Sequence, residues 1–289
     1  MFGDHLRRHV EALRSAGVRA RFSRHHESRH AGQPIHSKLL LAKVSNRVQF
    51  ICIWAGIIIV APHLTEEHTM RIGIVGAGFI GRAVAQIVLA AGHEVMLSNS
   101  RGPKTMSSVL AGITGCQIGT AEQATQFADV VLLAIPYEHI PSLPPAWFEG
   151  KTVLDANNYY PDRDGHIAAL DTFQSTTSRM LAEHLRGATV VKVFNAILAA
   201  DLLTDGRPHD SSERRALPVA ADDADAKALV VGLLDELGFD AVDAGGLDES
   251  WRFERAKPAY CAPLEKSGLT RALAAAEREV ELPLGSWRR

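Results

Sequence analysis

The most telling part of the sequence is Met70-Arg-Ile-Gly-Ile-Val-Gly76-Ala-Gly78-Phe-Ile-Gly81. Its apolar residues predict a buried parallel strand over Arg71–Val75, and an amphipathic helix is predicted over Phe79–Ala91. In the turn between them, Gly76 permits a tight bend, Gly78 lets the backbone approach phosphates, and Gly81 lets the helix pack close to the strand. The positive end of the helix would then face a pyrophosphate. The pattern predicts a dinucleotide site formed by Gly76, Ala77, Gly78, Phe79, Ile80 and Gly81.

The type of dinucleotide is indicated by the end of the next predicted strand, Glu94–Ser98. Proteins that bind NAD usually place an acidic residue there, where it binds the ribose 2′-hydroxyl. Here the chain reads Ser98-Asn99-Ser100-Arg101, and these hydroxyl, amide and guanidinium groups can bind a 2′-phosphate through charge-assisted hydrogen bonds. An ordinary polar turn is the alternative. We expect NADP as the cofactor, with Ser98, Asn99, Ser100 and Arg101 among its ligands.

After Met70, predicted strands and helices alternate, which is typical of a doubly wound parallel sheet. Further strands are predicted at 129–135, 152–155, 189–194, 217–220 and 239–243. Helices are predicted at 104–112, 121–128 (capped by Thr120), 178–185, 223–237, 248–255 and 268–281. We expect an α/β, Rossmann-like fold, with an NADP-binding domain over residues 70–200. A smaller C-terminal α/β unit over 201–289 is expected to serve substrate binding or dimerisation.

The first 69 residues differ from the rest of the chain. They hold ten Lys or Arg against five acidic residues, which leaves a net charge of −7 for residues 70–289 in a chain whose total is −2. Their apolar run at 48–61 has 14 residues, fewer than the roughly 20 needed to cross a bilayer. We expect residues 1–69 to be an N-terminal extension that is disordered or poorly packed, or a non-native start, and the functional protein to begin at Met70. We expect no membrane span.

Charge and cysteines exclude several classes of protein. The acidic balance of residues 70–289 offers no basic surface for nucleic acid. The three cysteines, Cys52, Cys116 and Cys261, show neither metal-ligand spacing nor a disulfide framework. This usage predicts a cytoplasmic protein without a metal site.

Five motifs occur together and in order. They are the glycine turn, Ser98-Asn-Ser-Arg-Gly-Pro103, Ala134-Ile-Pro136, Asp155-Ala-Asn157-Asn158 and Lys192-Val-Phe-Asn195. Over residues 70–289 the set resembles the NADPH-dependent deazaflavin (coenzyme F420) reductase family, and also the oxidoreductase domain of STEAP metalloreductases. The resemblance implies NADPH bound at the carboxyl ends of the strands, with Ala134, Ile135 and Pro136 lining the ribose and nicotinamide. It also suggests a homodimer.

The same resemblance places four residues near the second substrate: Asn157, which we also count among the cofactor ligands, and Phe194, Asn195 and Ala196. Each has a simpler alternative from the residues themselves. Asn157 and Asn195 can be loop caps, and Lys192 can be a strand lysine that reaches solvent.

Side chains suited to general acid catalysis are not evident, so no catalytic residue is assigned. His139 and His166 are single loop histidines, which we interpret as polar surface. Reduction of a ketone or imine commonly needs a proton donor, whereas a flavin-like ring can take its protons from water and mainly needs to be held at hydride distance. We expect an oxidoreductase that transfers hydride between NADP(H) and a flavin-, deazaflavin- or quinone-like acceptor.

Two alternatives stay open. One is an imine or ketoacid reductase related to pyrroline-carboxylate reductases or β-hydroxyacid dehydrogenases. The other is a non-catalytic NADP(H)-binding regulator.

Overall fold

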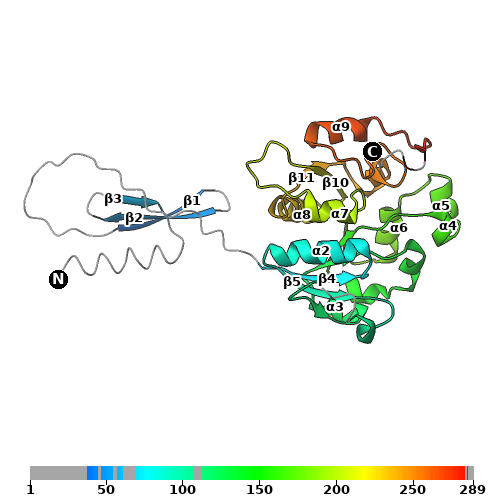
Figure 1. The fold of residues 1–289 in the computed structure, drawn as a ribbon, viewed down its shortest axis with the longest axis horizontal. Helices are drawn as coiled ribbons and strands as arrows, with labels where there is room; N and C mark the ends of the chain where they lie inside the picture. The colour runs from blue at the N-terminus through cyan, green and yellow to red at the C-terminus, as the bar shows by residue number, and fades with distance from the viewer. Residues whose placement is uncertain are drawn as a thin grey trace, which may run out of the picture. The chain divides into compact units, whose positions relative to one another are not determined.

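The structure, a computed structural model, describes residues 38–44, 47–54, 57–60, 69–106, 112–283 and 285. The chain divides into two compact units, Met1–His68 and Thr69–Arg289. In the first, three strands form an antiparallel sheet, namely β1 (Lys38–Val44), β2 (Arg47–Trp54) and β3 (Ile57–Val60) (Figure 1).

The expectation of disorder or poor packing over residues 1–69 falls largely outside the described residues. That the segment is a non-native start stays a prediction. In the part of the chain that the structure describes, no helix is both long and apolar enough to span a membrane.

The second unit is built on an eight-stranded sheet with the order β11-β10-β9-β8-β7-β4-β5-β6 (Figure 1). The strands from β4 to β9 are parallel where they pair, β10 runs antiparallel to β9, and β11 runs parallel to β10. The predicted Rossmann-like α/β sheet is confirmed. The strands are β4 (Arg71–Val75), β5 (Glu94–Ser98), β6 (Gln117–Ile118), β7 (Val130–Leu133), β8 (Thr152–Asp155), β9 (Thr189–Lys192), β10 (Ala216–Ala221) and β11 (Asp240–Asp243).

Helices cover both faces of this sheet, because successive residues of its central strands alternate between two buried cores. Ile72 and Ile74 face the core that α2 and α8 complete, whereas Val131 and Leu133 face the core that α6 completes. The longer helices are α2 (Phe79–Ala90), α3 (Ala121–Phe127), α6 (Thr177–His184), α8 (Ala224–Glu236) and α9 (Lys266–Ala274). The shorter ones are α4 (Pro161–Asp164), α5 (Ala168–Asp171), α7 (Ala199–Thr204) and the 3-10 helices η1 (Pro103–Thr105), η2 (Tyr137–Ser142), η3 (Pro145–Phe148) and η4 (Leu247–Phe253).

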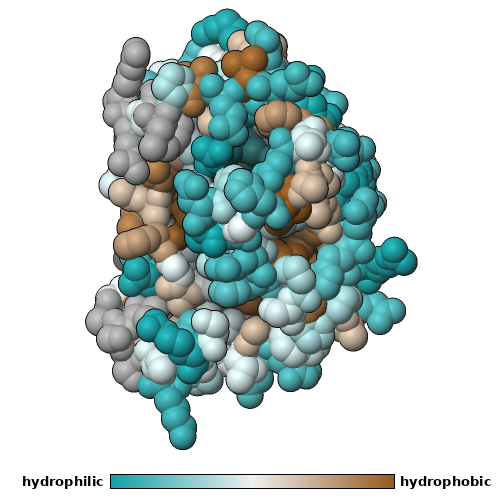
Figure 2. Space-filling model, turned by 90° about the vertical axis from the view of Figure 1, so that its right-hand side faces the viewer, coloured by the Kyte–Doolittle hydropathy of each residue, from teal (hydrophilic) through white to brown (hydrophobic). Residues whose placement is uncertain are grey.

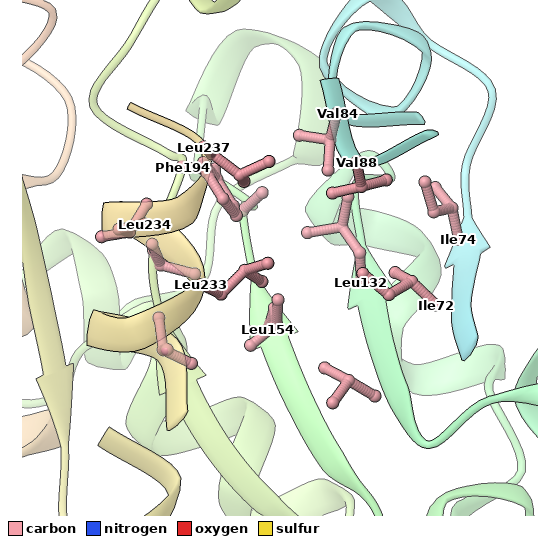
Figure 3. Packing of buried hydrophobic residues seen from close by; sticks show 14 of the residues in the cluster. Ile72, Ile74, Val84, Val88, Leu132, Leu154, Phe194, Leu233, Leu234 and Leu237 are labelled. Atoms are coloured by element: carbon pink, nitrogen blue, oxygen red, sulfur yellow. The ribbon is translucent and has the colours of Figure 1, made fainter. Parts of the chain in front are cut away.

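One continuous core joins the two parts that the sequence suggested as separate units. Figure 3 shows Leu237, the residue after α8, beside Phe194, and Leu233 of α8 near Leu154, with Val84 and Val88 of α2 on the other side of the cluster. Strands β10 and β11, which lie beyond residue 200, also extend the same sheet. The residues from Thr69 onward therefore pack as one body.

The C-terminal helix is shorter than the predicted 268–281, because α9 ends at Ala274. The ammonium of Lys257 binds the carbonyl oxygens of Glu277, Arg278 and Val280 at 2.7–2.8 Å. A helix over these residues would direct the carbonyls along its own axis, so the lysine holds the segment in an irregular conformation.

Two other helix predictions also changed. The helix predicted at 248–255 is the 3-10 helix η4. The helix predicted at 104–112 falls mostly outside the described residues, and the part that is described, η1, is a 3-10 turn. The predicted cap of α3 is confirmed: Thr120 accepts a hydrogen bond from the Gln123 amide, and the Gln123 side chain accepts one from the Thr120 amide.

Candidate functional site

The site residues predicted from the sequence lie at or directly after the carboxyl ends of parallel strands. Strand β4 lies between β5 and β7. The strands that follow β4 in the sequence are added first on its β5 side and then on its β7 side, so the direction in which the sheet grows reverses at β4. Ligands of open α/β sheets bind in the crevice outside such a point. Figure 2 views the side of the molecule toward which β4 points in Figure 1, and shows hollows where hydrophobic residues are exposed among polar ones.

The glycine turn has the geometry that a dinucleotide requires. Gly76 has a φ of 117°, and a side chain there would collide with the carbonyl oxygen of Ala134. A side chain at Gly81 would collide with the carbonyl oxygen of Gly76. A Cβ at Gly78, by contrast, would meet no heavy atom of the described residues within 4 Å. The first and third glycines thus permit the fold, and the second leaves the backbone open to a ligand.

The amino end of α2 completes this cradle. The first turn of the helix contains no acidic residue, and in the described structure no side chain caps it. Its first amides therefore point outward with the positive end of the helix dipole. The Phe79 side chain is 78% exposed, and the Arg82 guanidinium lies 5.3 Å from the centre of its ring. These residues fit an anionic pyrophosphate.

The residues expected to bind the 2′-phosphate, which lie at the end of β5 and in the turn after it, are of two kinds: two bond within the protein and two are exposed. Ser98 is fully buried, and its hydroxyl donates to the carbonyl of Ile74 at 3.1 Å, so this hydroxyl faces the sheet and not the crevice. Asn99 shapes the turn, because its side chain accepts from the Arg101 amide at 3.1 Å and donates to Thr105 at 2.9 Å. Ser100 and Arg101 are exposed. Among the described residues the Arg101 guanidinium has no hydrogen bond or ion pair, so it is available for an anion.

Asn157 holds the segment that follows β7. Its side-chain oxygen accepts a hydrogen bond from the amide of Ile135 at 2.8 Å, and its side-chain nitrogen donates to Asp155 at 2.8 Å. The side chain is almost fully buried. Ala134, Ile135 and Pro136 are half-buried at the crevice. The structure thus gives Asn157 a positioning role toward these three residues.

A buried ion pair lies beneath Asn157. Lys192 and Asp155, which are opposite each other in the β8–β9 register, are both fully buried, with 3.1 Å between Nζ and Oδ2. The ammonium also donates to the carbonyl of Asn157 at 2.5 Å and to Thr177 Oγ1 at 2.8 Å, which uses its three protons. The Ser178 hydroxyl donates to the same carboxylate oxygen at 2.6 Å. The alternative that Lys192 reaches solvent is wrong.

The three expected substrate residues have different surroundings. Phe194 has a φ of 62° and a buried ring that packs in the main core (Figure 3). Ala196 packs in a third buried cluster, with Phe253 and Leu269. Of the three, Asn195 offers a polar side-chain atom that a ligand can use.

Asn195 is held between two loops. Its side-chain nitrogen donates to Asn158 Oδ1 at 3.1 Å and to the carbonyl of Phe253 at 2.9 Å. Its side-chain oxygen is buried and has no donor among the residues that the structure describes. Buried polar atoms in proteins are normally satisfied, so a donor outside the described residues, such as a bound water or a ligand N–H, would complete the bonding of this oxygen.

A cavity of about 370 Å³ adjoins these loops. Glu254, which follows the Phe253 that Asn195 contacts, lines the cavity and also accepts hydrogen bonds from the amide and the hydroxyl of Thr177 at 3.0 and 2.7 Å. The cavity is lined by Tyr159, Pro161, His166, Leu170, Asp171, Phe173, Ser175, Trp251, Glu254, Arg255, Lys257, Arg278 and Glu281.

One wall of this cavity contains a chain of titratable groups. Tyr159 donates to Asp171 at 2.7 Å, and Nδ1 of His166 lies 3.0 Å from the other oxygen of Asp171. Burial raises the pKa of Tyr159, and the hydrogen bond to Asp171 raises it further. The hydrogen bond from Tyr159 lowers the pKa of Asp171. From the sequence His166 is interpreted as a single polar-surface histidine, because its neighbours Asp171 and Tyr159 are brought to it by the fold.

The family described as "NADP oxidoreductase coenzyme F420-dependent" matches residues 71–159. An uncharacterized oxidoreductase of Bacillus subtilis, YfjR, is 28% identical over 176 residues, which are 61% of this chain and 56% of that protein. The protein YjhV of Escherichia coli is 35% identical over 71 residues, which are 25% of this chain and 52% of that protein. The chain thus spans about half the length of the curated relatives that it matches.

Two solved structures share the architecture. The hypothetical protein SMa0349 from Sinorhizobium meliloti has 32% identity and a TM-score of 0.60, over 70% of this chain and 98% of that one. A candidate F420-dependent NADP-reductase from an Arthrobacter species has 24% identity and a TM-score of 0.54, over 62% of this chain and 86% of that one. The second of these supports the fold alone.

Proposed function

We propose that this chain is a member of the family described as "NADP oxidoreductase coenzyme F420-dependent", whose model matches residues 71–159, and that it transfers hydride between NADP(H) and a flavin-, deazaflavin- or quinone-like acceptor. The observation that carries the proposal is the crevice at the carboxyl ends of β4, β5 and β7. Within the described residues it combines an open backbone at Gly78, an uncapped helix end at Phe79 and a guanidinium at Arg101 that has no partner.

Different residues of the chain would bind different parts of the cofactor, NADP. The amides around Gly78 would bind the pyrophosphate, and Ser100 and Arg101 would bind the 2′-phosphate. The cofactor supplies the hydride from its nicotinamide. Ile135 and its neighbours would line that ring, and their position is fixed by the hydrogen bond from the Ile135 amide to Asn157.

The acceptor side of the site suits a flat ring. Tyr159, Phe173 and Trp251 line the adjoining cavity, and pockets lined by aromatic side chains with a few polar groups are typical ligand sites. The unsatisfied oxygen of Asn195 would accept from a ring N–H or a hydroxyl. A ring so held needs orientation at hydride distance more than it needs an acid.

The proposal is tested by steady-state oxidation of NADPH with riboflavin, FMN, a 5-deazaflavin and a soluble quinone, each repeated with NADH. We expect reduction of at least one of the four with NADPH and a much lower rate with NADH. The control is Arg186→Gln, a change at an exposed residue outside the crevice, which should leave the rates unchanged. If NADPH binds and none of the acceptors is reduced, the proposed activity is wrong and the chain is a nucleotide-binding regulator.

A second candidate, reduction of an imine or ketoacid, is favoured by one observation. The His166–Asp171–Tyr159 chain on the cavity wall is the kind of proton donor that such a reaction needs. Turnover of imines or ketoacids that is lost in His166→Gln, with no turnover of flavins, would select this candidate. The cytoplasmic location and the homodimer stay predictions.

A further inference from the structure

The carboxylate of Asp155, which is buried at the end of β8, accepts four hydrogen bonds. Its Oδ1 accepts from the backbone amide and from the side-chain nitrogen of Asn157, at 2.9 and 2.8 Å. Its Oδ2 accepts from the Ser178 hydroxyl at 2.6 Å and from the Lys192 ammonium at 3.1 Å. A carboxylate has about four acceptor positions and no donor, so each position of this one faces a donor.

Asn157 is held at all four of its polar atoms. Besides the two bonds to Asp155, its backbone carbonyl accepts from the Lys192 ammonium at 2.5 Å, and its side-chain oxygen accepts from the Ile135 amide at 2.8 Å. A backbone amide can only donate, so the oxygen of the Asn157 side chain must face Ile135 and the NH2 group must face Asp155. The orientation of the side chain is therefore fixed at both ends.

The Ile135 amide anchors the segment that follows β7. The preceding amide, that of Ala134, bonds to Val75 of β4 at 3.0 Å, and the next residue, Pro136, has no amide proton. The bond to Asn157 therefore holds the backbone where the proposed function puts the nicotinamide. A reversed Asn157 side chain would set its NH2 group against the Ile135 N–H, and two donors that face each other would push the segment away.

The ion pair beneath Asn157 supplies this order of donors and acceptors. A buried ion pair often stabilises a fold no more than two apolar side chains of similar size would. Apolar side chains could not orient Asn157, whereas the Lys192 ammonium only donates and the Asp155 carboxylate only accepts. The pair is therefore suited to fix the direction of every bond up to Ile135.

From these bonds, and on the basis of the proposed function, we propose that Lys192 and Asp155 position the nicotinamide half of NADP(H) for hydride transfer. Both side chains are fully buried, so they act through the orientation of Asn157 and the backbone of Ile135. A change in the order of the bonds should weaken binding of the nicotinamide half. The adenosine half, which would lie at the glycine turn and Arg101, should bind as before.

The test compares Asp155→Asn with Ser178→Ala. The first change keeps the shape of the side chain and turns one oxygen position into an NH2 group. Directed toward Lys192, this group would meet another donor; directed toward Asn157, it would favour the reversed side chain. Ser178→Ala is the matched control, because it removes a donor from the same carboxylate at the oxygen that does not bind Asn157.

Dissociation constants are measured with the full chain by isothermal titration, for NADPH and for 2′,5′-ADP, which lacks the nicotinamide and its ribose. Asp155→Asn should weaken NADPH binding on the order of tenfold, as expected when a buried polar group loses its partner, and leave 2′,5′-ADP binding unchanged. Ser178→Ala should keep the wild-type ratio of the two constants. Partial unfolding does not alter this ratio, because it lowers both apparent affinities by the same factor.

Two further variants keep the test decisive. The double variant with Asp155→Asn and Lys192→Met should regain part of the NADPH affinity, because the new NH2 group can then face the Ser178 hydroxyl while the amide oxygen faces Asn157. If Asp155→Asn does not fold, Lys192→Gln replaces it. Its NH2 group has two protons for the three acceptors of the ammonium, so it should shift the ratio in the same direction.

Equal weakening of both ligands, or of neither, overturns the inference and leaves the ion pair a structural role alone. The same shift in Ser178→Ala also overturns it, since any loss at the carboxylate would then act alike. If the four acceptors are reduced by NADPH and the ratio does not shift, the proposed function stands and this inference fails. If the ratio shifts but NADPH reduces none of them, the positioning of the nicotinamide stands and the proposed function fails.

Discussion

Replacement of Lys192 by Met is expected to destabilise the fold strongly, because it leaves the buried carboxylate of Asp155 without its cation. Both side chains are fully buried, and the ammonium satisfies Asp155, the carbonyl of Asn157 and Thr177 at 2.5–3.1 Å. Removal of one partner from such a pair costs about 3–5 kcal/mol. Met has a similar length, so lost packing contributes little.

The assay is urea unfolding followed by far-UV circular dichroism, with the free energy of unfolding extrapolated to water. Lys266→Met is the matched control, since that ammonium is largely exposed and lies 3.9 Å from Asp240; it should cost about 0–1 kcal/mol. The double variant with Asp155→Asn and Lys192→Met removes both charges and should recover part of the loss. A loss below about 1 kcal/mol for Lys192→Met, or a double variant no more stable than the single one, would refute the buried ion pair.

The other predictions concern the cofactor crevice and the sheet. Arg101→Ala should weaken NADPH binding by about 1.5–3 kcal/mol and leave NADH binding unchanged in isothermal titration; equal losses would mean that Arg101 does not contact the 2′-phosphate. Gly78→Ala should keep the melting temperature of the wild type, because the added Cβ meets open space, yet lose NADPH binding. Gly232→Ala, also in open space but inside helix α8, should keep NADPH binding and raise the melting temperature slightly, since Ala favours a helix more than Gly does. Asp129→Asn should lose stability at pH 7, since the hydrogen bond from Arg71 holds the pKa of Asp129 below its ordinary value of 3.8. That stability is complete above pH 3.8 and is lost as the pH falls through the lower folded pKa, so the difference from wild type in urea unfolding should shrink with acid; a constant difference would contradict the pairing.

The strands, turns and caps were predicted correctly where neighbouring residues determine the local structure. The apolar run of β7 and the glycine turn after β4 have one plausible structure each, and the cap at Thr120 needs only the residues next to it. Prediction was weaker where the end of an element depends on a residue far away in the sequence. Helix α9 ends at Ala274, and the carbonyls beyond it bind Lys257, a residue that the local sequence does not reveal as a neighbour.

The candidate site shows the same division. The expected cofactor ligands are consecutive residues at the end of each strand, so sequence motifs are enough to propose them. That the Ser98 hydroxyl is buried and bonded to Ile74 could not be predicted from a motif. The pairing of Lys192 with Asp155 requires the β8–β9 register. The cavity requires the tertiary fold, because Tyr159, Trp251 and Arg278 come from three separate segments.

The central claim, hydride transfer between NADP(H) and a flat acceptor, is tested most directly with NADPH that carries two deuterium atoms at nicotinamide C4. The acceptor is a 5-deazaflavin, whose C5 is a carbon and does not exchange its hydrogen with water. Mass spectrometry of the reduced product should show a single deuterium at C5 when the reaction is run in ordinary water. Reduced deazaflavin without deuterium at C5 would contradict the account.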